Sequence, residues 1–364
     1  MVYTLYFTYL VIGAFLVKLV GGKKAFLFIA YFILLLIIGL RNISVGPDTL
    51  SYVEDFRFLT SLSYSRMLVE AFDSSEPLYT IISWLPSLLS NNYTLYLLTW
   101  ALFPACSLYI VSRDVLYDSK DYLVSIIVFF LLGLFAFYVA GIRQTAALSL
   151  VMPAAIRMNR RFSSEFGFGG KLKVIAKYLI IIGIAYLIHN SSLIALLAIP
   201  LMFVKVRWWY IAIIIVVQNV STSLDVGDIA VASELFFNDR FAVYGVRESS
   251  LNLSAFIMQL ILFLMCFSVK QRLEMQDAKN NFFLMMMLVG LLVQSLAPIV
   301  GEMFRISFYF SIFGIVLVPR ALKALPKSIN IMAYVSFVSA SLIYLFFLTK
   351  SNLPEYSSVF SLFD

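Results

Sequence analysis

Three arginines and one histidine are the residues of this chain whose types and positions could do chemistry. Arg41 ends an apolar run, Arg143 begins another, Arg305 lies inside a third, and His189 is the only histidine. Guanidinium groups bind phosphate through charge-assisted hydrogen bonds and can stabilise the negative charge of a leaving group. An imidazole can take a proton from a hydroxyl at neutral pH. These side chains together predict transfer from a phosphorylated donor to a hydroxyl acceptor.

Arg143 is the strongest of these candidates because the helix dipole does not explain it. It follows Gly141 at the start of a helix, where a cation is disfavoured. Free backbone amides and a guanidinium at that position would suit a diphosphate. The alternative interpretation is an ion pair with an external carboxylate such as Glu302.

The catalytic base is left open between His189 and Asp48. Asp48 follows the turn at Gly46 and Pro47 and begins a predicted amphipathic surface helix over 48–60. A carboxylate there would also favour the helix dipole without any catalytic role. His189 has an equally plain alternative, a hydrogen-bonded packing residue at a helix end.

The polar candidates for contacts with a substrate, Arg41 and Arg305 among them, share a predicted external position. They are Arg41, Tyr52, Gln144, Arg240, Tyr244, Glu302, Arg305 and Tyr309. Five of these have structural alternatives. Arg41 could extend to the lipid head groups, Tyr52 could be an interface anchor, and Arg240 could pair with Asp239 or Glu248. Glu302 and Arg305 could form a local ion pair. Nothing has the spacing of a metal cluster or a nucleotide-binding loop, so we expect no metal and no cofactor.

The elements that must position these residues are membrane helices. The chain has 364 residues, of which 62% are hydrophobic and only 13% are charged. Long apolar runs with short polar gaps predict an all-α polytopic membrane protein, a single membrane domain over 1–364. A net charge of +7 follows from orientation in the membrane, so nucleic acid is not expected as a partner.

The apolar runs predict about twelve transmembrane helices plus short external interfacial helices. The predicted spans are 2–20, 24–40, 93–112, 121–140, 142–158, 174–189, 190–204, 208–220, 251–269, 281–300, 302–318 and 329–349. Lys and Arg then gather on one side, which the positive-inside rule assigns to the cytoplasm. The segments near 41–92 and 221–250 become external, and 76–90 is interpreted as an interfacial or re-entrant helix.

The ordered set of motifs resembles the EpsG family of Wzy-like polysaccharide polymerases. The matching residues are Arg41, Asp48 and Tyr52 after an early span, Arg143 with Gln144, His189 with Asn190, Arg240 with Tyr244, and Arg305 with Tyr309. Pro47 departs from the pattern, since a small or hydroxyl residue is more usual before the aspartate.

The resemblance implies a membrane glycosyltransferase that polymerises repeat units carried on undecaprenyl diphosphate, for O-antigen, capsule or exopolysaccharide. Its site would face the periplasm or exterior of a bacterial inner membrane. Lipid-linked glycans would be donor and acceptor, no metal would be needed, and membrane lipids and a chain-length regulator would be partners.

Two other functions remain open from the sequence. A lipid-linked oligosaccharide flippase also has about a dozen spans, but polar groups on one side and the lack of a visible repeat count against it. A glycosyltransferase that uses a polyprenyl-phosphate sugar would take Asp48, Glu54 or Asp55 as its base. An O-antigen ligase is a neighbouring class that would normally carry a longer loop than 221–250.

Overall fold

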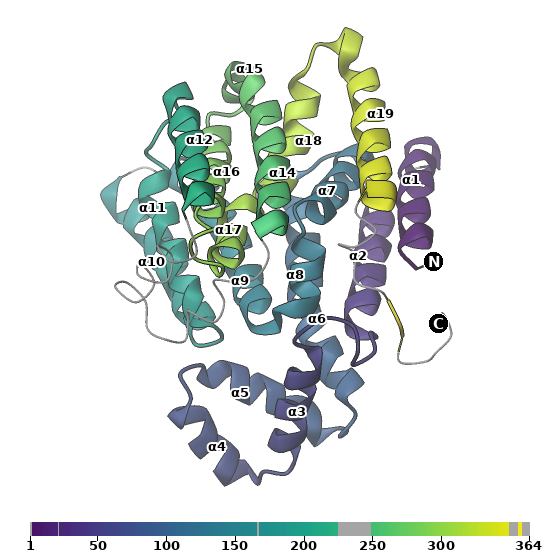
Figure 1. Ribbon diagram of the computed structural model, residues 1–364, viewed down its shortest axis with the longest axis vertical. Helices are drawn as coiled ribbons and strands as arrows, with labels where there is room; N and C mark the ends of the chain where they lie inside the picture. The colour runs from purple at the N-terminus through teal and green to yellow at the C-terminus, as the bar shows by residue number, and fades with distance from the viewer. Residues whose placement is uncertain (1, 21, 166, 225–248, 349–355, 359–364) are drawn as a thin grey trace. The chain divides into compact units, whose positions relative to one another are not determined.

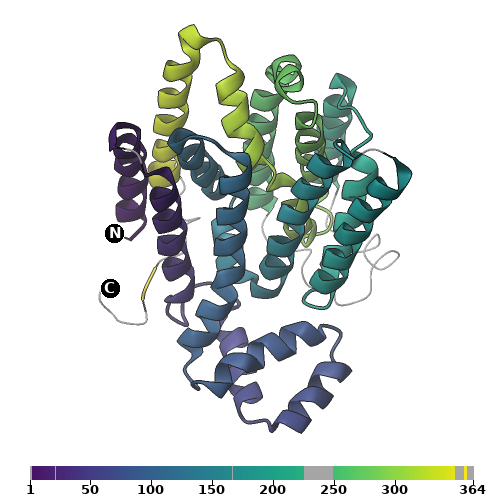
Figure 2. The ribbon, with the colours of Figure 1, turned by 180° about the vertical axis from the view of Figure 1, so that it is seen from behind.

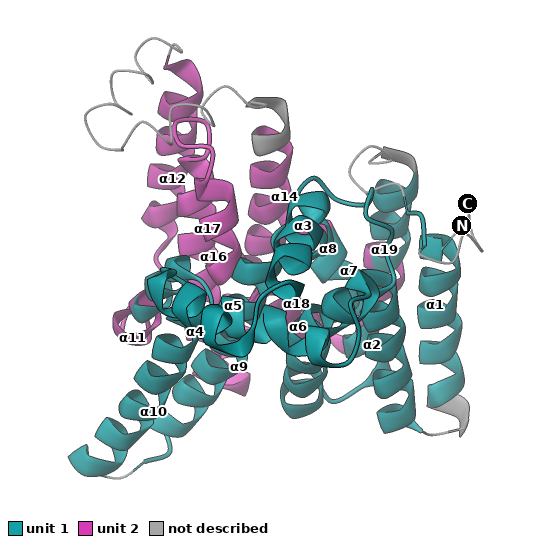
Figure 3. Cartoon of the chain, turned by 90° about the horizontal axis from the view of Figure 1, so that it is seen from below, with its two compact units in different colours: residues 1–130, 135–196, 338–364 teal, residues 131–134, 197–337 magenta. Residues whose placement is uncertain are grey.

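Helices joined by turns and loops, with one isolated β-bridge, make up the computed structural model within residues 2–20, 22–165, 167–224, 249–348 and 356–358 that it describes (Figure 1). The predicted all-α class is therefore confirmed. The chain divides into two compact units (Figure 3). Unit 1 comprises 1–130, 135–196 and 338–364, and unit 2 comprises 131–134 and 197–337.

Unit 1 is built on a bundle of long apolar helices. They are α1 (Val2–Val20), α2 (Lys23–Gly39), α6 (Tyr93–Val115), α9 (Ile142–Phe162) and α10 (Phe168–Tyr186). Helix α2 packs on α6, α6 on α9, and α9 on α10. Large side chains such as Trp100 and Tyr178 fill the interior. The bundle brings the start of α9 and the end of α10 into the same unit.

Three short helices follow α2 and lie at the lower end of unit 1 in Figures 1 and 2. They are α3 (Thr49–Thr60), α4 (Tyr64–Asp73) and α5 (Pro77–Trp84), and a 3-10 helix at Leu85–Leu88 follows them. The helix predicted over 48–60 is confirmed as α3, whereas α4 was not predicted. Val53, Phe56 and Leu59 are buried as their spacing indicates, but Leu50 is 51% exposed.

Two helices of this part of the chain form one bent pair. Helix α7 (Ser119–Leu131) meets α8 (Leu134–Ala140) at an angle of 62°. Gly133 between them has a φ of +73°, a left-handed conformation that glycine adopts without strain. The span predicted as continuous over 121–140 is therefore broken.

Unit 2 contains most of the remaining helices. They are α11 (Ala198–Leu201), α12 (Trp208–Ser223), α14 (Ser249–Ser268), α15 (Lys270–Gln276), α16 (Asn280–Ser295), α17 (Met303–Ser311), α18 (Gly314–Ala324) and much of α19 (Lys327–Ile343). Helix α16 packs on α12, α14, α17 and α18. A Cβ atom on Gly290 would come within 2.8 Å of the Ser311 backbone nitrogen, so glycine permits the close approach of α16 and α17.

The described helices are long and apolar enough for two membrane crossings, α6 and Lys327–Phe346. Three bent pairs raise the number to five if each pair is one span. The second of them joins Leu253–Ser268 to α15, and the third joins α17 to α18. The protein is thus a helical membrane protein, while about twelve spans stays a prediction.

Candidate active site

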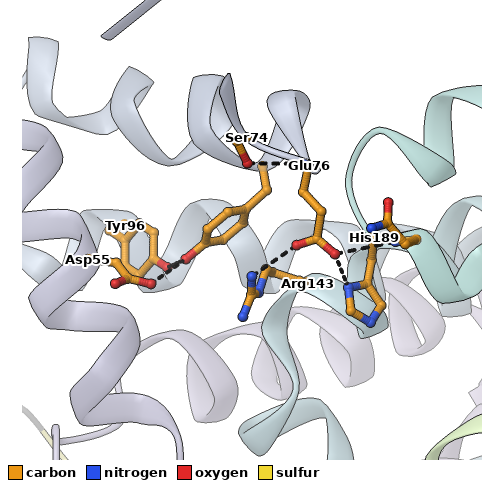
Figure 4. Close-up of polar contacts among 8 residues, drawn as sticks. Asp55, Ser74, Glu76, Tyr96, Arg143 and His189 are labelled. Atoms are coloured by element: carbon orange, nitrogen blue, oxygen red, sulfur yellow. Dashed lines mark hydrogen bonds and ion pairs between the residues drawn. The ribbon is translucent and has the colours of Figure 1, made fainter. Parts of the chain in front are cut away.

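The carboxylate of Glu76 joins two residues that the sequence singled out (Figure 4). Its Oε2 atom accepts a hydrogen bond from Nη1 of Arg143 at 2.9 Å. Its Oε1 atom lies 2.5 Å from Nδ1 of His189 and accepts a hydrogen bond from the Asn190 backbone at 3.3 Å. One carboxylate therefore holds a cation and an imidazole side by side within unit 1.

Local structure fixes Glu76 at the start of α5. Pro77 occupies the first turn, where its missing N–H costs nothing. The hydroxyl of Ser74 accepts a hydrogen bond from the Glu76 backbone nitrogen at 3.0 Å. The backbone nitrogen of Leu78 donates to the carbonyl of Leu187 at 2.9 Å, which ties α5 to the end of α10.

His189 and Arg143 come from the ends of two packed helices. The His189 backbone nitrogen donates to the Ala185 carbonyl at 2.8 Å, just beyond the last turn of α10. Arg143 is the second residue of α9, directly after Gly141 and Ile142. Because α9 packs on α10, helix packing brings these ends together although the residues are far apart in the sequence.

Aromatic rings surround the Arg143 guanidinium. Its Cζ atom lies 5.0 Å from the ring centroid of Tyr79 and 5.7 Å from that of Tyr52, within cation–π range. The Tyr79 hydroxyl lies 3.2 Å from the Tyr96 hydroxyl and donates to Asp55 at 3.4 Å. These contacts orient a guanidinium that keeps 40% of its side-chain surface exposed, so part of it can reach a ligand.

Burial and charge act in opposite directions on Glu76, whose side chain is 8% exposed. Burial raises the pKa of its carboxyl, but the His189 hydrogen bond, with the charges of His189 and Arg143, outweighs burial and holds that pKa below its usual value. The carboxylate is therefore ionised at neutral pH and can only accept hydrogen bonds. It consequently orients His189 with its proton on Nδ1.

The surroundings of Arg41 differ from those expected of a side chain that binds a substrate. Its side chain is 1% exposed, and its guanidinium donates to the carbonyls of Ile38 at 2.5 Å and Val139 at 3.0 Å. A third bond reaches the hydroxyl of Thr49 at 3.3 Å. Burial lowers the pKa of Arg41 to about 10. In this structure Arg41 holds the loop after α2 to α8, rather than facing a ligand.

The other predicted site residues of unit 1 have varied settings. Asp48 is the N-cap residue of α3 and is half-buried, but its side chain does not cap the helix. Tyr52 is 8% exposed beside Arg143, and Gln144 is 6% exposed on the next position of α9. Asp48 as base and Gln144 as a substrate contact stay predictions.

The site residues predicted near the C-terminus belong to unit 2. Arg305 and Glu302 lie 3.5 Å apart as an i, i+3 ion pair at the start of α17, so the local alternative occurs. Tyr309 is 1% exposed in the same helix. The alternative interpretation of Arg143, an ion pair with an external carboxylate, occurs in the structure, with Glu76 of the predicted external segment 41–92 as the partner in place of Glu302. Arg240 and Tyr244 lie outside the described residues.

Glu76 is the residue of this candidate site that the sequence reasoning missed. It lies at the head of the apolar segment 76–90, beside Pro77. An ionisable residue retained next to a membrane-embedded segment is costly and therefore usually functional, and that signal could have identified it. No group of three His, Cys, Asp or Glu side chains gathers in the part of the chain that the structure describes, so this part offers no candidate metal site.

Comparison with known proteins gives one match. Residues 24–361 match the model of the EpsG family, which covers nearly the whole chain. Neither the curated proteins nor the solved structures contain a match.

Proposed function

The chain belongs to the EpsG family, and from that premise we propose that it polymerises glycan repeat units carried on undecaprenyl diphosphate. Membership of the family indicates a membrane polymerase of the exopolysaccharide or O-antigen type. The contact of Glu76 with both His189 and Arg143 supports the finer proposal, because it brings an imidazole next to a guanidinium. Transfer from a diphosphate donor to a hydroxyl needs both groups.

His189 is the proposed base. Since Glu76 binds Nδ1, Nε2 is the ring nitrogen that would accept a proton from the acceptor hydroxyl. That hydroxyl belongs to the terminal sugar of a second lipid-linked unit. Its oxygen forms a bond to the anomeric carbon of the donor while the bond between that carbon and the diphosphate oxygen breaks. Glu76 stabilises the imidazolium that results, as a carboxylate does in hydrolase triads.

Arg143 is the proposed ligand of the leaving diphosphate. Within the guanidinium, Nη1 is the nitrogen that donates a hydrogen bond to Glu76. The exposed part of the side chain can donate to phosphate oxygens. The charge that grows on the diphosphate as the glycosidic bond breaks would be stabilised most in the transition state. Arg305 belongs to unit 2, and its role as a phosphate contact stays a prediction.

The proposal includes about twelve spans in a bacterial inner membrane, with the site on the periplasmic or outer face. A chain-length regulator is a proposed partner. The distribution of Lys and Arg supports this orientation.

Conversion of a purified lipid-diphosphate repeat unit by the detergent-solubilised protein tests the proposal. We expect a ladder of products on a gel, and no ladder from the His189→Ala variant. A verified substrate that gives no ladder but crosses vesicle membranes would assign the protein to the flippases. A ladder formed only from a monophosphate-linked sugar would assign it to the polyprenyl-phosphate transferases.

A further inference from the structure

A cavity of about 360 Å³ opens between α9 and α10 of unit 1, far along α9 from Arg143. Arg157, one of its lining residues, lies 14 positions beyond Arg143, which is about 21 Å along a helix. The cavity is therefore separate from the candidate active site. Its volume is at the lower end of the range of about 300–1,000 Å³ that ligand pockets occupy.

Positive charge dominates the rim of this cavity. Arg157 and Arg161 come from α9, Lys173 and Lys177 from α10, and Glu165 is the one acid that lines it. Each basic pair has i, i+4 spacing on its own helix, where like charges destabilise the helix. The arrangement thus has an electrostatic cost that an anion in the cavity would remove.

The chain supplies little neutralising charge of its own. Arg157 lies 3.6 Å from the carboxylate of Asp114. Arg161, Lys173 and Lys177 are exposed and have no ion pair with any residue that the structure describes. A ligand with one or two negative charges would offset part of this positive charge.

The wall below the rim is apolar. Val174 and Tyr178 are buried residues of α10, and Ala154 of α9 faces the same cavity. Ile181 extends this wall along α10. A free phosphate would use the rim only, whereas a phosphate attached to a hydrocarbon chain would use both parts.

We propose that this cavity binds an anionic phospholipid, with its phosphate on the basic rim and an acyl chain along the apolar wall. Basic pockets between membrane helices bind such head groups on the cytoplasmic side. The basic residues of the cavity are themselves among the Lys and Arg residues that the positive-inside rule assigns to the cytoplasmic side. The proposal does not depend on the glycosyltransferase reaction.

Native mass spectrometry of the full-length protein in detergent tests this site by titration with phosphatidylglycerol. We expect the double variant Lys173→Gln, Lys177→Gln to bind this lipid about tenfold more weakly. The double variant Lys205→Gln, Arg207→Gln is the matched control, because it loses the same charge from exposed residues outside the cavity. It should bind within about twofold of the wild type. The double variant Lys173→Arg, Lys177→Arg should keep the affinity, since it keeps the charge.

Phosphatidylcholine and inorganic phosphate are the comparison ligands. If the pocket and control variants weaken phosphatidylglycerol binding equally, the proposal is overturned, because the lipid is then attracted non-specifically by the charge of the protein. Binding of inorganic phosphate that displaces phosphatidylglycerol at equal concentration would overturn it in favour of a free-anion site. Melting temperature without lipid checks folding, and the single change Arg161→Gln provides the same test if the double variant does not fold.

Discussion

The Oε1 atom of Glu76 and the Nδ1 atom of His189 lie 2.5 Å apart, although 113 residues separate them in the sequence. The same carboxylate binds Arg143 through its other oxygen. The proposed base and the proposed phosphate ligand are therefore coupled, because a change at Glu76 affects both the imidazole and the guanidinium.

Glu76→Gln should lower the turnover number by about 100-fold or more, because a neutral amide neither fixes the His189 tautomer nor stabilises an imidazolium. The measurement is steady-state polymerisation with purified lipid-linked substrate. A merely structural role would lower the amount of folded protein, whereas a positioning role lowers the turnover number of the folded fraction. Glu76→Asp should recover part of the activity.

Glu70→Gln is the matched control for Glu76→Gln. Glu70 is an exposed carboxylate on α4, in the same group of short helices, and its removal should leave turnover within about twofold. Equal loss of activity in the two variants would remove the special role of Glu76.

Added imidazole should partly restore the activity of the His189→Gly variant, since a free base could then occupy the vacated position.

Arg143→Ala should abolish polymer formation while leaving folded protein in the membrane. The variant loses a phosphate ligand whose effect is greatest in the transition state, so a fall of about 100- to 1,000-fold is expected. Arg143→Lys should recover only part of it, because lysine lacks the planar guanidinium that binds a carboxylate and a phosphate together. Arg66→Ala, an exposed arginine on α4, is the control. Normal polymer from Arg143→Ala would refute the diphosphate site.

Much of the fold followed from hydropathy, whereas the helix breaks did not. Runs such as 24–40 and 93–112 became α2 and α6 with ends shifted by a few residues. Hydropathy averages over a window, so a single left-handed glycine at Gly133 is invisible to it. Helix α4 was missed because its exposed Tyr64, Val69 and Phe72 give no continuous apolar run.

Part of the site could be predicted from residue type, since a lone histidine and a membrane arginine are unusual wherever they occur. His189 and Arg143 do meet in the structure, through Glu76. Which carboxylate would join them depends on contacts between distant segments, and spacing along one chain carries no information on these. For the same reason the buried network of Arg41 was not foreseen.

Acid should reduce the stability contributed by Glu76. Burial raises the pKa of this carboxyl, but His189 and Arg143 lower that pKa by a larger amount. The folded-state pKa therefore lies below the ordinary value of 4.5. The unfolded chain then binds more protons, so the contribution is present above about pH 4.5 and is lost as the pH falls through the folded-state pKa.

Thermal unfolding in detergent at several pH values measures this effect. The difference in melting temperature between wild type and Glu76→Gln should narrow as the pH falls below about 4.5. A difference that stays constant down to pH 3 would show that the ionised carboxylate contributes no stability.

Polymerisation should survive EDTA, because guanidinium groups and not a divalent cation are proposed to neutralise the leaving diphosphate. The rate with excess chelator should stay within about twofold of the rate with Mg²⁺. A twofold change in rate corresponds to less than about 0.5 kcal/mol in the activation barrier. Loss of the ladder in EDTA and its return with Mg²⁺ would contradict the arginine mechanism. A divalent cation would then neutralise the leaving diphosphate.

Arg41→Met should destabilise the folded protein, and this outcome distinguishes a supporting arginine from a phosphate ligand. The change removes three hydrogen bonds and leaves the carbonyls of Ile38 and Val139 buried without their donor. A loss of about 2–4 kcal/mol is expected from the desolvation of such groups. The melting temperature should fall clearly below that of Arg143→Ala, whose exposed guanidinium contributes less to folding. A folded Arg41→Met protein with unchanged melting temperature but no activity would instead support the direct phosphate role that the sequence predicted.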